Sequence, residues 1–162
     1  MLILDSNIWI LSLIESDGEH AELREQIENG DERSAVDAYI YNEVVENLRR
    51  VPDVNREEIN GLIEDFTAVI RSSHIETPTQ TEIERLVLDE VRNRPAHITL
   101  ARALRIQPKD APIVALAVKH AIEIQATGSD EQVTIITGDR SFGELEPGEY
   151  GLGVEMKYLP YP

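Results

Sequence analysis

Met1-Leu2-Ile3-Leu4-Asp5-Ser6-Asn7-Ile8-Trp9-Ile10 is the stretch that decides the predicted fold. Its short apolar run ends abruptly in an acid, which is typical of a buried parallel strand that carries a carboxylate at its C-terminal edge. Asp5, Ser6 and Asn7 suit the cap of a helix that resumes at Ile8. Ligands of open α/β sheets bind at that carboxyl edge. Asp5 is therefore the first candidate site residue, with helix capping as its alternative role.

Length and composition limit the class of protein. The chain has 162 residues, which suits a single domain large enough to bury a core. It contains no cysteine, so a disulfide framework and a thiolate metal site are excluded. No apolar run approaches the roughly 20 residues that a bilayer requires, and Asp5 interrupts the first run too early for a signal peptide. We expect one soluble, cytoplasmic domain over residues 1–162, with no membrane partner.

The net charge is the strongest global signal. Asp and Glu number 31 against 15 Lys and Arg, which gives a formal charge of −16 at pH 7. Such an excess repels itself and destabilises the compact state in dilute buffer, whereas at about 1 M salt the Debye length shrinks to roughly 3 Å. We therefore expect a halophilic cytoplasm. An acidic docking face for a basic partner and a merely soluble acidic protein are the alternatives.

The spacing of apolar residues between the first helix and residue 106 predicts mainly helices. The charged segment 15–31 reads as a solvated helix that ends at Asn29-Gly30. Residues 34–40 read as a second short strand, which leads into a helix over 41–50 that carries Glu43. The remainder, about 51–106, is predicted to be a helical middle section, and its expected elements are helices at 55–70, 79–92 and 96–105 with a brief edge strand at 74–77.

Two more acids follow in similar settings. Pro112 is tolerated only in the first turn of a helix, and the apolar run beyond it predicts a helix buried on most sides, so Asp110 stands at a buried helix start. The helix dipole favours an acid there whatever its function. Val133–Thr137 is the clearest strand, and Gly138-Asp139 after it repeats the pattern of Asp5. A last strand is expected at 154–159.

With these acids placed, the chain resembles the PIN-domain family of metal-dependent ribonucleases, in particular its VapC-like toxins from prokaryotic toxin–antitoxin pairs. The resemblance covers about residues 1–50 and 107–145. It rests on Leu-Asp-Ser-Asn-Ile around Asp5, Glu43 in the second-strand helix, Asp110 before Ile-Val-Ala-Leu-Ala, and Ile-Thr-Gly-Asp-Arg-Ser-Phe around Asp139. It implies a three-layer α/β/α fold with a central, mainly parallel sheet, and the charge adds a halophilic archaeon as the expected source.

The resemblance also implies a metal site. Asp5, Glu43, Asp110 and Asp139 would hold one or two Mg²⁺ or Mn²⁺ ions, because hydrolysis of a phosphodiester needs an activated water and neutralisation of the charge that grows on the phosphoryl oxygens. Such a cluster would be strongly repulsive without a cation. Glu46, one turn from Glu43, is the alternative for the second position.

Further residues have both a functional and a structural interpretation. Ser6, Asn7 and Thr137 are candidates for orienting the carboxylates or a water molecule. They would serve equally well as helix caps or turn residues. Arg140 is a candidate RNA contact, with an exposed ion pair as the alternative. The four histidines show no ligand spacing and are expected at the surface or as incidental residues.

Other functions and partners stay open at this stage. A catalytically inactive PIN-like module that binds RNA or protein is one alternative. A haloacid-dehalogenase-like phosphatase is another, although that family places a second Asp where this chain has Asn7. The resemblance implies an RNA substrate as a partner. The resemblance and the apolar spacing in the helix at 55–70 together predict an antitoxin protein or a second copy of the chain as a further partner.

Overall fold

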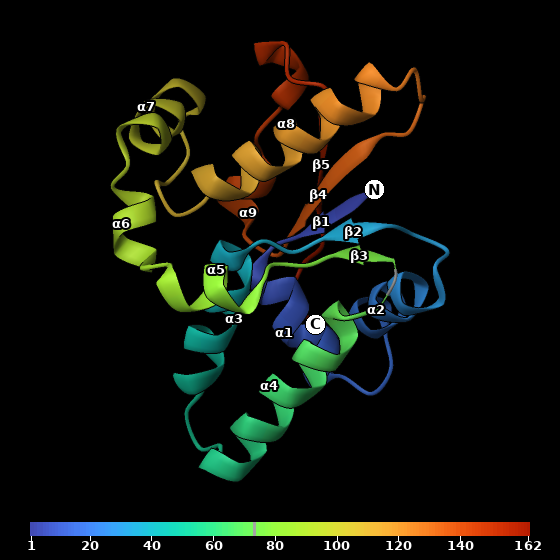
Figure 1. The fold of residues 1–162 in the computed structure, drawn as a ribbon, viewed down its shortest axis with the longest axis vertical. Coiled ribbons are helices and arrows are strands. Elements are labelled where there is room, and N and C mark those ends of the chain that lie inside the picture. The colour runs from blue at the N-terminus through green and yellow to red at the C-terminus, as the bar shows by residue number, and fades with distance from the viewer. Residues whose placement is uncertain (73) are drawn as a thin grey trace. The chain divides into compact units, whose positions relative to one another are not determined.

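The computed structural model describes residues 1–72 and 74–162. The chain divides into two compact units, one formed by Met1–Asp5 with Val87–Pro162 and the other by Ser6–Leu86. Figure 1 labels their helices and strands. Each unit is described by itself below.

The first unit is built on three parallel strands, β1 (Leu2–Leu4), β4 (Val133–Thr137) and β5 (Val154–Tyr158). β4 pairs with both others, so that Ile135 faces Ile3 on one side and Met156 on the other. Its apolar side chains are buried, as expected for a parallel strand that is covered on both faces. Because the strands are parallel, the carboxyl ends of β1 and β4 meet at one edge.

The helices of this unit include the buried helix that the sequence predicts. They are α6 (Leu88–Arg92), α7 (Pro95–Leu104), α8 (Ala111–Ala126), α9 (Arg140–Gly143) and the 3₁₀ turn η1 (Pro147–Tyr150). α8 packs against β4 and buries Ile113, Val114 and Ala117. Pro112 lies in its first turn, where the missing N–H costs nothing.

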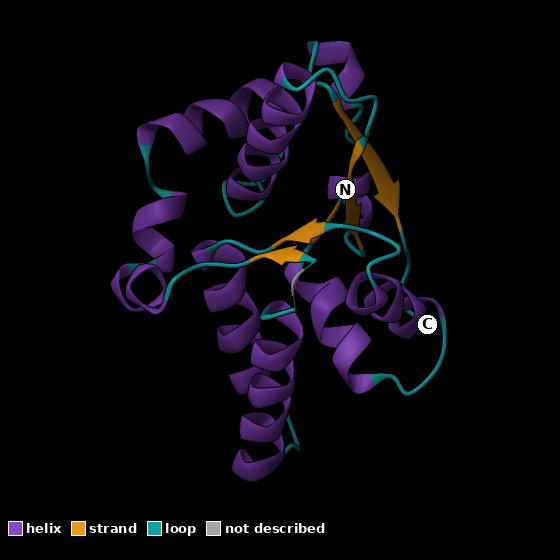
Figure 2. Ribbon diagram, turned by 45° about the vertical axis from the view of Figure 1, so that its right-hand side comes forward, coloured by secondary structure: helices purple, strands orange, loops and turns teal. Residues whose placement is uncertain are grey.

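The second unit is mainly helical, as the purple ribbons of Figure 2 show. Its short strands β2 (Ser34–Ala35) and β3 (Ile75–Glu76) pair in parallel. Phe66 is central to the core, with its ring centroid 5.4 Å from that of Trp9 and 5.6 Å from that of Tyr41. The helices are α1 (Ser6–Ile14), α2 (Glu19–Asn29), α3 (Ala38–Arg49), α4 (Arg56–Ile70) and α5 (Gln80–Arg85).

Several predicted boundaries are confirmed by their capping residues. α2 ends at Asn29, and Gly30 follows in the left-handed conformation with φ of 82°. Asn55 caps α4 by accepting a hydrogen bond from the backbone N–H of Glu58, and Thr79 and Glu82 form the predicted capping box of α5. Over the described residues, every helix is too short or too polar to cross a membrane.

Three predicted boundaries are wrong. The second strand ends at Ala35 rather than at residue 40, because the Asp37 carboxylate accepts a hydrogen bond from the backbone N–H of Ile40 at 2.9 Å and starts α3 early. The single helix predicted at 79–92 is two helices, since Leu86 and Val87 are extended. α1 begins at Ser6 instead of Ile8.

Candidate active site

Asp5 leaves β1 at the carboxyl edge of the first unit. Its backbone N–H donates to the Ile136 carbonyl at 2.9 Å, which extends the pairing of β1 with β4 by one residue. Its side chain is buried, with 5% of the residue exposed, and its Oδ2 accepts a hydrogen bond of 2.8 Å from the Thr137 hydroxyl. The sequence-predicted residues Asp5 and Thr137 are thus in direct contact.

Asp139 lies two residues beyond the end of β4 and reaches the same hydroxyl. Its backbone N–H donates to Thr137 Oγ1 at 3.0 Å, while its Oδ1 accepts from the backbone N–H of Phe142 at 3.1 Å and caps α9. The fully buried Thr137 hydroxyl therefore donates to one acid and accepts from the backbone of the other. Through this hydroxyl, Asp5 and Asp139 are fixed at the same edge.

Asp110 is the third acid of this unit and immediately precedes α8. Its carbonyl accepts hydrogen bonds from the backbone N–H groups of Ile113 and Val114 at 3.1 and 3.2 Å, so the helix begins on its backbone. The residue is only 5% exposed. Within the described part of the chain, its carboxylate makes no hydrogen bond that caps α8. Capping is therefore not the reason for an acid here.

The second unit contains the remaining predicted residues. Glu43 is buried in the middle of α3, with 6% of the residue exposed. Ser6 is also buried, and its Oγ lies 3.5 Å from Asn47 Nδ2, while Asn7 is half-buried in the first turn of α1. The sequence did not single out Asn47 as a contact of Ser6, although it follows Glu43 by one helical turn.

The predicted carboxylates suit a hard divalent cation by their chemistry. All of their donor atoms are oxygens, which Mg²⁺ and Mn²⁺ prefer. In the ranges that the structure describes, no three Asp, Glu or His side chains stand close enough together to hold a metal ion. Asp5 Oδ2 and Asp139 Oδ1 each accept a protein hydrogen bond. Holding a cation would require the carboxylates to come closer together than they stand here.

Arg140 and the histidines differ in how far they match the prediction. The Arg140 side chain is 83% exposed, and its Nε lies 3.5 Å from Glu144 Oε1, which is the exposed ion pair foreseen as its alternative role. His20 and His120 are buried, so their predicted surface position is wrong. His20 is covered where α1 packs on α2, and its Nδ1 lies 3.1 Å from Glu15 Oε2.

An acidic pocket of about 370 Å³ lies beyond α9 in the first unit. Glu144, Glu146 and Glu149 line it together with Tyr150. The hydrogen bond that the protonated Glu149 carboxyl donates to Glu146, and then the negative charge of Glu146, raise the pKa of Glu149 above its ordinary value. The lining also includes Arg105, so three carboxylates face one guanidinium there. The excess of carboxylates disfavours the approach of an RNA backbone.

The comparisons with known proteins identify the family to which the fold belongs. The model of the PIN domain family matches residues 2–146, and the chain therefore belongs to the PIN domain family. The predicted fold class, three-layer α/β/α with a parallel sheet, is confirmed. PIN domains are generally Mg²⁺- or Mn²⁺-dependent nucleases. No curated protein sequence matches this chain.

A solved structure also has a similar fold. It is the crystal structure of FitAcB from Neisseria gonorrhoeae, which is 16% identical in sequence with a TM-score of 0.54. The superposition covers 99% of this chain and 98% of that chain. At this identity the likeness shows the fold alone.

Proposed function

We propose that this chain is a metal-dependent endoribonuclease that hydrolyses phosphodiester bonds of RNA. Asp5, Asp110 and Asp139 are the proposed ligands of Mg²⁺ or Mn²⁺. Glu43 is the proposed fourth carboxylate, and its assignment rests on the resemblance to the family and on its burial. The observation that supports the proposal most is the burial of Asp110 at a helix start that it does not cap in the described ranges.

The energetic argument starts from the cost of burying charge. Removing a carboxylate from water costs several kcal/mol unless a partner compensates it. Asp5 and Asp110 are both buried in one unit. A bound divalent cation would offset the cost of burying their charges.

Each side chain has a proposed role, and its hydrogen bonds suggest which. The cation would activate a water molecule and neutralise charge on the scissile phosphate. Thr137 holds the Asp5 carboxylate in a fixed orientation by donating to Oδ2. Ser6 and Asn7 are proposed to orient Glu43 or the attacking water, and Arg140 is proposed to leave Glu144 and contact an RNA phosphate.

A nuclease assay tests this function against its alternatives. The purified chain, with Mg²⁺ or Mn²⁺, should cleave a single-stranded RNA, and removal of the metal by EDTA should stop cleavage. Asp139→Asn should be inactive although folded. An inactive PIN-like module would bind RNA without cleaving it, and a phosphatase would instead hydrolyse a phosphate monoester.

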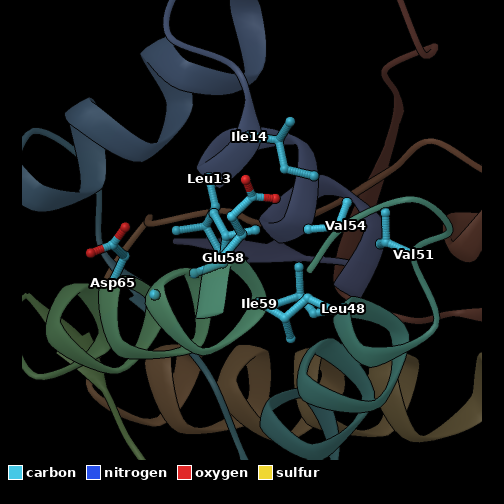
Figure 3. A pocket seen from close by; sticks show the side chains of 10 residues that line it. Leu13, Ile14, Leu48, Val51, Val54, Glu58, Ile59 and Asp65 are labelled. Carbon is cyan, nitrogen blue, oxygen red and sulfur yellow. The ribbon is translucent and has the colours of Figure 1, made fainter. Parts of the chain in front are cut away.

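An antitoxin is the proposed protein partner. The second unit has an apolar pocket of about 500 Å³, lined by α4 together with Leu13, Ile14 and Leu48. Figure 3 shows these aliphatic side chains with the carboxylates of Glu58 and Asp65. An amphipathic helix with apolar and basic residues would complement both features. The proposed role as a toxin requires such an antitoxin.

Sedimentation distinguishes the two proteins that this pocket could receive. A toxin should form a stable complex with a small protein encoded beside it, and Ile59→Asp, in the lining of the pocket, should prevent that complex. If the chain alone is a dimer that Ile59→Asp dissociates, the pocket belongs to a second copy instead. Binding unaffected by Ile59→Asp would exclude the pocket.

A further inference from the structure

The segment Leu159–Pro162 brings an aromatic side chain against Gly138, the residue before Asp139. Leu159 is buried, and its backbone N–H donates to the Thr137 carbonyl at 2.8 Å. Two residues later, the Tyr161 ring lies on Gly138, the residue before Asp139. A Cβ atom on Gly138 would stand 2.6 Å from Tyr161 Cε1 and 2.9 Å from its Cζ. The close approach of this ring therefore requires glycine at position 138.

The same segment is stiff for local reasons. Proline fixes φ at position 160, and Pro162 restricts Tyr161 to extended conformations. Tyr161 nevertheless keeps 50% of its surface exposed. The Tyr161 ring is thus held beside the proposed catalytic edge and is half open to solvent. Because the ring is already held in place, it loses little conformational entropy when a flat ligand covers it.

We propose that Tyr161 is a stacking platform for a nucleobase of single-stranded RNA at this edge. The inference rests on the proposed ribonuclease function and names its substrate class. Bases in a duplex are already stacked on one another, so only an unpaired base can cover the ring. Tyr161 would therefore position the strand, while the carboxylates act on the phosphate.

The net charge of this chain gives such a platform a physical reason. With a net charge of −16 the protein repels the RNA backbone in dilute buffer. In molar salt the repulsion is screened, but attractive contacts with phosphates are weakened as well. Stacking on an aromatic ring is not a contact between charges, so salt leaves it in place. Substrate affinity in molar salt would then depend mainly on Tyr161.

A binding experiment tests the platform without requiring cleavage. Affinity for a short fluorescein-labelled single-stranded RNA is measured in the Asp110→Asn background. Tyr161→Ala should lower the affinity on the order of tenfold or more, Tyr161→Trp should preserve it, and the loss should persist from low to molar KCl. Tyr150→Ala is the matched control, since Tyr150 is a similarly exposed tyrosine of the same unit beside the acidic pocket.

A second readout reports the stacking itself. The chain has one tryptophan, Trp9, and it is fully buried. Tyr161→Trp adds an exposed indole, and its fluorescence should be quenched by the single-stranded RNA and much less by the duplex of the same sequence. Gly138→Ala should weaken binding by displacing the Tyr161 ring, and should have no further effect in a Tyr161→Ala protein.

The outcomes separate this inference from the proposed function. Unchanged affinity in Tyr161→Ala, or equal quenching by duplex and single strand, overturns the platform even if the wild-type chain cleaves RNA. Tyr161-dependent binding by a wild-type chain that cleaves nothing upholds the platform and refutes the nuclease. In an active enzyme, Tyr161→Ala should raise KM while kcat changes little.

Discussion

Asp110 and Asp139 occupy the same kind of position but are used differently. Both residues directly precede a helix of the first unit. Asp139 is half-buried and accepts a hydrogen bond from the backbone N–H of Phe142. Asp110 is almost completely buried, yet in the described ranges its carboxylate does not cap α8. Helix capping therefore explains part of the role of Asp139 and none of the burial of Asp110.

The largest effect is expected for Asp110→Asn. The substitution keeps the shape of the side chain but removes a charge from the proposed metal ligands. Cleavage should therefore fall by more than about a hundredfold, beyond the roughly 10- to 100-fold loss typical for residues that only hydrogen-bond to a metal ligand. The metal-free protein should melt at the same or a higher temperature, because a buried repulsion is relieved.

Asp37→Asn is the matched control for Asp110→Asn. Asp37 caps α3 through Ile40, and asparagine caps a helix about as well as aspartate. Cleavage and stability should both stay close to wild type. If Asp110→Asn cleaves RNA as well as Asp37→Asn does, Asp110 is a structural residue. The proposed difference between Asp110 and Asp139 would then be wrong.

Asp139→Asn is expected to have the next largest effect. Activity should fall by on the order of a hundredfold, and the amide oxygen of asparagine can still accept from Phe142, so circular dichroism should show an unchanged fold. Unchanged cleavage would remove Asp139 from the catalytic residues. Cleavage and folding lost together would leave it as a structural cap.

A smaller effect is expected for Thr137→Val. The substitution removes the hydroxyl that joins Asp5 to the backbone of Asp139, and activity should fall by roughly 10- to 100-fold. The fold should lose about 1–3 kcal/mol in urea unfolding, because a buried acceptor loses its donor. Thr134→Val, on the same strand but half-buried, is the control and should change neither quantity much.

The dependence of the melting temperature on KCl should distinguish repulsion between buried carboxylates from repulsion between surface carboxylates. If the charge of −16 reflects a halophilic protein, the melting temperature should rise steeply between low and molar KCl, because surface charges are screened. The stability gained by Asp110→Asn should persist in molar KCl, since buried charges are screened much less. A flat melting profile would contradict the inferred salt adaptation.

The sequence predicted most clearly those features that local patterns determine. The apolar runs identified β1 and β4, and parallel pairing then placed Asp5, Thr137 and Asp139 at one edge. The extent of the second strand was not predictable from hydrophobicity alone. Its residues 38–40 are apolar and suit a strand, but the Asp37 carboxylate accepts from the Ile40 N–H and the Asp37 carbonyl accepts from the Tyr41 N–H, so they belong to α3.

Properties that depend on distant parts of the chain could not be predicted. Asp110 could be assigned to a buried helix start, but whether its carboxylate caps that helix depends on side-chain conformation. Tyr161 attracted no attention because its importance comes from contact with Gly138, which lies 23 positions earlier in the sequence. The burial of His20 likewise arises from the packing of α1 on α2.

The most direct test of the central claim is an electron paramagnetic resonance titration with Mn²⁺, which measures metal binding without any substrate. The wild-type chain should reduce the signal of free Mn²⁺, Asp37→Asn should match it, and Asp110→Asn should leave substantially more Mn²⁺ free. Equal binding of Mn²⁺ by Asp110→Asn and the wild-type chain would contradict the assignment of the buried aspartates as metal ligands.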